Sequence, residues 1–133
     1  MPVIAAALLI LAQGMAPPVR AEQVPLIGNE GPDLDACIGI GRVSTLEPDL
    51  AVREQPGDYA RQKDRLPHST LVWLCEKGGG ENGEDWQGIV YPSGEYQDLG
   101  DCRVSSPVPE PRPYAGPCRF GWVIARDIRL VTS

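Results

Sequence analysis

The sequence predicts an all-β fold, a small antiparallel barrel of five strands. Glycine (15) and proline (14) are both abundant, as in chains of short strands joined by turns. No stretch after residue 21 has an apolar period of 3.6 residues, whereas several short runs alternate apolar and polar residues. A closed barrel is the economical arrangement, because closure leaves no strand edge unpaired.

The first residues have the pattern of a targeting segment. Residues 3–12 form an uninterrupted apolar run, about as long as the core of a signal peptide and too short to cross a bilayer comfortably. Val19 and Ala21 are the small or β-branched residues expected just before a cleavage site. We therefore expect residues 1–21 to be a signal peptide and the protein to be periplasmic or secreted. A buried apolar strand or a membrane anchor is the alternative.

The four cysteines agree with export. Cys37, Cys75, Cys102 and Cys118 are widely spaced and form no Cys-x-x-Cys pair, so neither a zinc ribbon nor a thioredoxin-type motif is indicated. Structural disulfides in an oxidising compartment are the natural interpretation. Three pairings are possible. We favour Cys102–Cys118, because it closes one loop on itself, which leaves Cys37–Cys75.

The predicted barrel occupies residues 37–133. Before it, residues 22–36 contain Gly, Pro and acidic residues without an apolar period, which predicts a flexible leader. Polar loops are expected at 59–65 and 77–85, and a single 3₁₀ turn at 125–127. The strand-like runs are 38–44, 50–53, 69–75, 85–91 and 120–124, with a final short run at 128–131.

A long insertion separates the two strands of the central predicted hairpin. Residues 85–91 and 120–124 are the strands, and residues 92–118 replace a tight turn. Five prolines between 107 and 117 favour an extended, polyproline-like backbone. The insertion is either a recognition arm or a cover for the barrel. We favour the cover, because a disulfide and Tyr114 would tie the segment down.

Four short motifs follow one another along the chain: Leu50-Ala51-Val52-Arg53, Pro56-Gly57, Asp85-Trp86-Gln87-Gly88 and Gly121-Trp122-Val123. Their order resembles the bacterial SH3-like (SH3b) domain family over about residues 40–131. This chain departs from the family at Ala51, where the family usually has Asn, in a Pro-Gly turn that the family usually has as Gly-Pro, and in the insertion. The resemblance implies a five-stranded SH3-like barrel with a long insertion in the hairpin before the Gly-Trp-Val strand.

Aromatic side chains are the candidate ligand-binding residues. In SH3-like barrels such positions often line the groove beside the long first loop, and stacked aromatic rings can bind proline-rich peptides or sugar faces. The alternative is that Trp122 belongs to the core and Trp86 covers the barrel end. The candidates are Tyr59, Trp86, Tyr91, Tyr114 and Trp122.

Charge and motif content argue against several function classes. The net charge is −6 and the chain has no basic run, so binding to nucleic acid or to anionic lipid is disfavoured. The acidic loop 81–85 lacks the ligand spacing of an EF-hand, which makes a solvated turn the better interpretation. His68, the only histidine, has no nucleophile motif near it. We expect no cofactor, no metal and no enzymatic activity.

The sequence therefore predicts a monomeric, exported, non-enzymatic SH3-like module that binds a periplasmic or cell-wall peptide or protein. An inhibitor- or toxin-like protein that acts through the stapled loop 102–118 is the alternative. A hydrolase with an unrecognised site is a third, weaker hypothesis.

Overall fold

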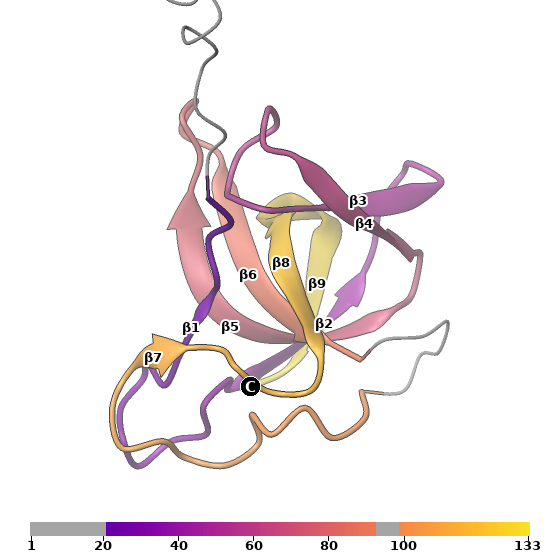
Figure 1. The fold of residues 1–133 in the computed structure, drawn as a ribbon. Helices are drawn as coiled ribbons and strands as arrows, with labels where there is room; N and C mark the ends of the chain where they lie inside the picture. Colours follow the sequence, from indigo (N-terminus) through magenta and orange to yellow (C-terminus); the bar gives the residue numbers. More distant parts are fainter. Residues whose placement is uncertain (1–20, 93–98) are drawn as a thin grey trace, which may run out of the picture.

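A computed structural model of the chain describes residues 21–92 and 99–133. The predicted signal peptide therefore lies, apart from Ala21, outside the described residues. The described residues form an all-β, antiparallel structure (Figure 1). Its elements are β1 (Leu26–Ile27), β2 (Gly39–Val43), β3 (Asp49–Arg53), β4 (Gln62–Pro67), β5 (Leu71–Gly79), β6 (Asp85–Tyr91), β7 (Arg112–Pro113), β8 (Arg119–Ile124), the 3₁₀ turn η1 (Ala125–Asp127) and β9 (Ile128–Thr132).

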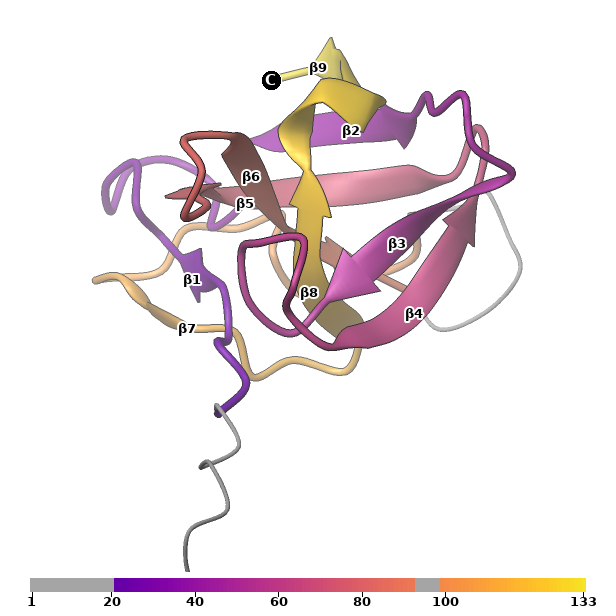
Figure 2. The same cartoon turned by 90° about the horizontal axis from the view of Figure 1, so that it is seen from above.

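The predicted five-stranded closed barrel is wrong. The main sheet has seven strands in the order β4-β3-β8-β6-β5-β2-β9, and β1 pairs with β7 in a separate two-stranded sheet. The main sheet curls strongly (Figure 2) but stays open, because β4 and β9 lie at its two ends and each pairs with one neighbour only. The predicted hairpin is present, since β6 pairs with β8 from Trp86–Ile124 to Tyr91–Arg119.

Strand β4 lies largely where a polar loop was predicted. It pairs with β3 over most of its length, yet Leu66 is its only buried residue. An edge strand is hydrogen-bonded on one side and can carry charges along its whole length, so it shows little apolar alternation. Its sequence, Gln62-Lys63-Asp64-Arg65-Leu66-Pro67, therefore resembles that of a loop.

The inner face of the curled sheet holds one hydrophobic core. Its fully buried side chains come from five strands, and they alternate with more exposed neighbours on β2 and β3. This alternation is the pattern that the sequence shows at residues 38–44 and 50–53. The side chains with no exposed surface in this core are Val43, Val52, Val72, Ile89 and Val123.

A second core covers the outer face of the sheet. Val90 on β6 has no exposed surface there and packs with Ile27 from the N-terminal segment and with Val104, Val108 and Tyr114 from the long β6–β8 connection. The described part of that connection thus lies against the sheet, as the covering role predicts. Figure 1 shows the two segments running together beside the sheet.

Residues 22–36 are packed against the sheet, in contrast to the flexible leader that the sequence predicts. Ile27 and Ala36 are 4 % and 3 % exposed. Strand β1 pairs with β7, and Asp35 forms an isolated bridge with Pro107. The segment has no apolar period because only a few of its residues face the protein. The partner strand lies more than eighty residues away in the chain, so local sequence cannot reveal it.

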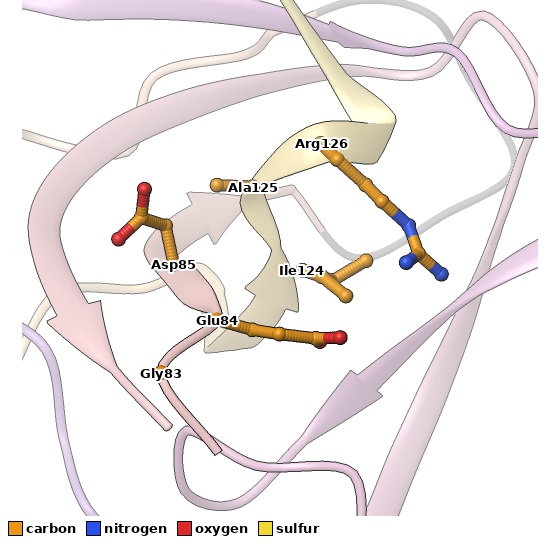
Figure 3. A pocket seen from close by; sticks show the side chains of 6 residues that line it. All are labelled: Gly83, Glu84, Asp85, Ile124, Ala125 and Arg126. Carbon is orange, nitrogen blue, oxygen red and sulfur yellow. The ribbon is translucent and has the colours of Figure 1, made fainter. Parts of the chain in front are cut away.

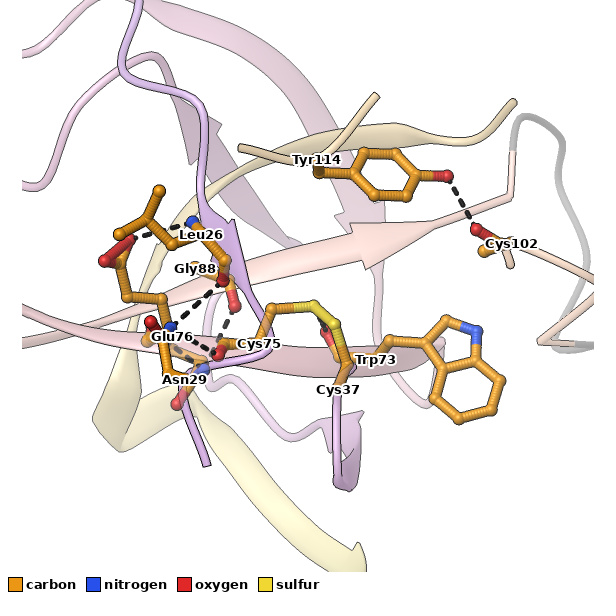
Figure 4. Close-up of a disulfide and its surroundings, with 10 residues drawn as sticks. Leu26, Asn29, Cys37, Trp73, Cys75, Glu76, Gly88, Cys102 and Tyr114 are labelled. Carbon is orange, nitrogen blue, oxygen red and sulfur yellow. Dashed lines mark hydrogen bonds between the residues drawn. A yellow bond between two sulfur atoms is a disulfide. The ribbon is translucent and has the colours of Figure 1, made fainter. Parts of the chain in front are cut away.

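Both favoured disulfides are present. Cys37–Cys75 ties the N-terminal segment to β5 (Figure 4). Cys102–Cys118 closes the connection on itself. No described cysteine is free. Two intramolecular disulfides are typical of proteins from oxidising compartments. In the part of the chain that is described, no helix is both long and apolar enough to span a membrane.

Candidate functional site

Two adjoining hollows lie between the β3–β4 loop, the β5–β6 hairpin end and the start of the N-terminal segment. Their volumes are about 480 Å³ and about 260 Å³, and both contain Gln55, Pro56 and Glu81 in their walls. We call this continuous surface the Tyr59 groove. Its remaining lining residues are Ala21, Gln23, Glu54, Tyr59, Ala60, Arg61, Glu76, Lys77, Gly78, Gly79 and Trp122.

Tyr59 is the exposed aromatic residue of the groove. Its side chain is 98 % exposed at the tip of the β3–β4 loop. The loop is held in shape from within: Ala60 N–H donates to the Gly57 carbonyl (3.2 Å), and the Arg53 guanidinium donates to the Ala60 carbonyl (2.9 Å). Gly57 has a φ of +143°, which favours glycine at this turn. The loop therefore presents a ring to solvent from a fixed backbone.

Trp122 forms the floor at the other end of the groove. Its ring has no exposed surface and lies over two strands whose glycines leave room for it. A Cβ on Gly78 would come within 2.7 Å of the ring, and one on Gly88 within 3.2 Å. The Trp122 indole N–H donates a 2.9 Å hydrogen bond to the Gln23 carbonyl. The ring is thus fixed from several sides.

The N-terminal segment makes one wall of the groove. Gln23 N–H donates to the Glu54 carbonyl (2.9 Å), and the Gln55 side-chain amide donates to the Ala21 carbonyl. The Glu22 carboxylate forms an ion pair with Lys63. The wall therefore begins at the residues that flank the predicted cleavage site.

The groove carries an excess of acidic side chains. Its carboxylates are Glu54, Glu76 and Glu81, against the cations Arg61 and Lys77. Arg61 lies 3.8 Å from Glu54, and the Glu76 carboxylate accepts a 3.2 Å hydrogen bond from Leu26 N–H. An acidic surface beside an exposed ring favours ligands that bring an amine or guanidinium together with an apolar or flat group.

The other three candidate residues are buried and hold the fold together. Trp86, Tyr91 and Tyr114 are 3 %, 2 % and 5 % exposed, and none of them lines the two hollows of the Tyr59 groove. Tyr114 donates to the Cys102 carbonyl (2.9 Å, Figure 4) and accepts from Cys118 N–H (2.9 Å). Burial raises the pKa of Tyr114, which keeps its hydroxyl protonated as a donor. Trp122 has no exposed surface either, so it belongs to the core beneath the groove. A binding role for these four residues stays a prediction; the geometry favours Tyr59.

A third hollow of about 520 Å³ lies at the β5–β6 hairpin end beside η1. Glu84 and Arg126 extend toward the same side of it (Figure 3). One Glu84 carboxylate oxygen is buried without a hydrogen-bond partner among the described residues, and Arg126 is 72 % exposed. Residues 21–92 and 99–133 contain no group of three His, Cys, Asp or Glu side chains that could hold a metal ion.

Sequence reasoning missed most of the groove wall. Gln55, Glu81 and Lys77 belong to segments that predict only loops, and no local pattern marks them as neighbours. The sequence predicts a turn at Pro56-Gly57, but it does not show that Pro56 lines the Tyr59 groove. Comparison of the chain with protein-family models, with curated proteins and with solved structures finds no match.

Proposed function

We propose that this chain is an exported, non-enzymatic, SH3-like binding module whose Tyr59 groove takes an extended peptide of the cell envelope, either a peptidoglycan stem or a segment of a protein. The observation that carries the proposal is the groove itself, in which the exposed Tyr59 ring lies near three carboxylates and the buried Trp122 ring supports the far end from below.

The order of the elements supports an SH3-like assignment. In the main sheet, strand β2 and the charged β3–β4 hairpin are followed by the long strands β5 and β6, the Gly-Trp-Val strand β8, the 3₁₀ turn η1 and the last strand β9. Strand β9 pairs with β2. The sequence motifs that resemble the SH3b family occur in the same order along the chain. The open sheet and the segment that covers its outer face are features of this chain that the resemblance did not imply.

The chemistry of the groove supports a ligand with both a flat or apolar part and a positive charge. A tyrosine ring offers a face for proline or for an aliphatic stem, and carboxylates attract amines. Peptidoglycan stems and basic peptides share this chemistry. The two disulfides, which are typical of an oxidising environment, support a partner outside the cytoplasm.

The loop closed by the Cys102–Cys118 disulfide gives less support to an inhibitor-like function. Cys102, Val104, Val108 and Tyr114 are all at most 7 % exposed and pack on the outer face of the sheet. A loop that plugs the site of another enzyme has to project its side chains outward. These four side chains of the loop cover the sheet instead, while most of its other residues are exposed.

Sedimentation with purified peptidoglycan and a pull-down from an envelope fraction test the proposal. We expect the mature chain to be retained in one of them, and Tyr59→Ala to lose most of that retention. Leu46→Ala is the matched control, because Leu46 is fully exposed but lines none of the hollows. Since Tyr59 is 98 % exposed, its replacement leaves stability within about 0.5 kcal/mol. No retention in either assay, or equal retention of the Tyr59→Ala and Leu46→Ala variants, would contradict the proposal.

A further inference from the structure

The two open edges of the main sheet differ in chemistry. On β4, three charged residues (Lys63, Asp64 and Arg65) precede Pro67, and this combination discourages another strand from pairing. On β9, Leu130 and Val131 are 60 % and 49 % exposed. Arg129 is the only charged residue of β9. One edge is therefore protected and the other is available for strand addition.

The register places two arginines side by side at the available edge. Arg42 on β2 is directly opposite Arg129 on β9, so both side chains lie on one face of the sheet. Like charges at such positions repel. Arg42 donates to the Ser69 carbonyl (3.0 Å), and among the described residues neither arginine has a carboxylate partner. This is notable in a chain with a net charge of −6.

An apolar side chain continues the same face on β2, where Ile40 lies two residues before Arg42. On β9 the register shifts between Leu130 and Thr132, so Val131 has no residue opposite it on β2 and the alternation is interrupted there. Ile38, which precedes β2, is 37 % exposed. The edge therefore presents a row of exposed backbone beside two guanidiniums and a small apolar strip.

We propose that the free edge of β9 binds an extended, acidic segment of a partner protein by strand addition. The backbone of the partner pairs with β9, and a carboxylate side chain reaches Arg129 and Arg42. A second copy of this chain fits less well, because β9 has no carboxylate to offer to the two arginines. This surface is separate from the Tyr59 groove.

A peptide of alternating pattern, acetyl-Thr-Val-Glu-Val-Glu-Val-Thr-amide, is the probe. Titration into the isotope-labelled chain, followed by backbone amide shifts, reports both affinity and location. We expect the shifts to concentrate on β9 and the binding to weaken as salt is raised. The same peptide with Lys in place of Glu is expected not to bind.

Arg129→Glu is the test variant. It is expected to bind the acidic peptide at least about tenfold more weakly, because an attraction becomes a repulsion. The variant puts Glu opposite Arg42, so it is expected to be as stable as the parent, and weaker binding cannot then reflect unfolding. Arg112→Glu makes the same charge change at an exposed position on β7 and is expected to bind normally.

Three results would overturn the proposal. The first is equal binding of the acidic and basic peptides. The second is an equal effect of Arg129→Glu and Arg112→Glu. The third is self-association of the parent chain through β9 in analytical ultracentrifugation, because a second copy would then be the occupant of the edge.

Discussion

The hydroxyl of Tyr91 donates a 2.8 Å hydrogen bond to Oδ2 of Asp64, which joins the middle strand β6 to the edge strand β4. The Arg119 guanidinium donates to the same oxygen at 3.2 Å. Tyr91 is 2 % exposed and its ring packs in the inner core, so this contact lies where water has little access. It holds the charged β3–β4 hairpin against the rest of the sheet.

Removal of this hydroxyl is expected to weaken the fold. Tyr91→Phe keeps the ring in the core and removes a hydrogen bond to a charged group, for which a loss of about 1.5–3 kcal/mol in the free energy of unfolding is typical. Urea denaturation measures the change. Tyr59→Phe is the control, because Tyr59 is almost fully exposed, and it is expected to unfold like the parent. Equal stability of all three proteins would show that the Tyr91–Asp64 bond contributes nothing.

The same contact predicts how stability depends on pH. Burial, followed by the hydrogen bond and charge of Asp64, raises the pKa of Tyr91 above its ordinary value. The folded protein therefore holds the Tyr91 proton more tightly than the unfolded chain. The stabilisation is complete below the pKa of tyrosine in the unfolded chain, about 10, and is lost progressively as pH rises above it.

Unfolding free energies measured between about pH 8 and about pH 10.5 test this slope. We expect the parent to lose more stability over this range than Tyr91→Phe, so that the two curves converge at the alkaline end. Lysines titrate equally in both proteins and cancel in the comparison. Parallel curves would contradict the prediction.

The glycines beneath Trp122 give a matched pair of substitutions on one strand. A Cβ at Gly78 would lie 2.7 Å from the Trp122 ring, whereas a Cβ at the next residue, Gly79, would meet nothing within 4 Å. Gly78→Ala is expected to cost about 1–3 kcal/mol through overpacking, and Gly79→Ala about nothing. Thermal unfolding compares the two, and the near-ultraviolet circular dichroism of tryptophan reports whether the ring has moved. A loss of similar size at both positions would argue against a packed ring.

The two disulfides are expected to contribute unequally. Cys37–Cys75 closes a loop of sequence separation 38, and Cys102–Cys118 closes one of 16. Chain entropy predicts a stabilisation of about 4 kcal/mol for the longer loop and about 3 kcal/mol for the shorter one. Paired replacement by alanine, followed by denaturant unfolding, measures each. Mass-spectrometric mapping of the native protein checks the pairing first; four free thiols would remove the basis of both values.

Much of the strand pattern could be predicted from the sequence. The runs that became β2, β3, β5, β6 and β8 alternate or are β-branched. β2 and β3 bury alternate residues, which imposes the alternation, whereas β6 and β8 bury consecutive residues on both faces. The 3₁₀ turn and the hairpin of β6 and β8 were also predicted. The even number of cysteines and their spacing led us to favour the disulfide pairing that the structure has.

The candidate site was predicted much less completely. Tyr59 was predicted in a polar loop and Tyr91 at the end of a strand, but the sequence did not show that the Tyr91 ring would be covered while the Tyr59 ring stays exposed. Burial of Tyr91 depends on the β3–β4 hairpin folding over it. That hairpin was missed because β4 is a polar edge strand.

The sequence by itself determined the all-β class and most of the core strands, because local spacing and side-chain type are enough to specify them. It favoured one of three cysteine pairings, the one that the structure has. Only the tertiary structure decided that the sheet stays open, that residues 22–36 and the long β6–β8 connection cover its outer face, and which residues meet in the Tyr59 groove. The physical reason is that these features arise from contacts between segments tens of residues apart. Each segment contributes one or two buried side chains, too few to leave a period in the sequence.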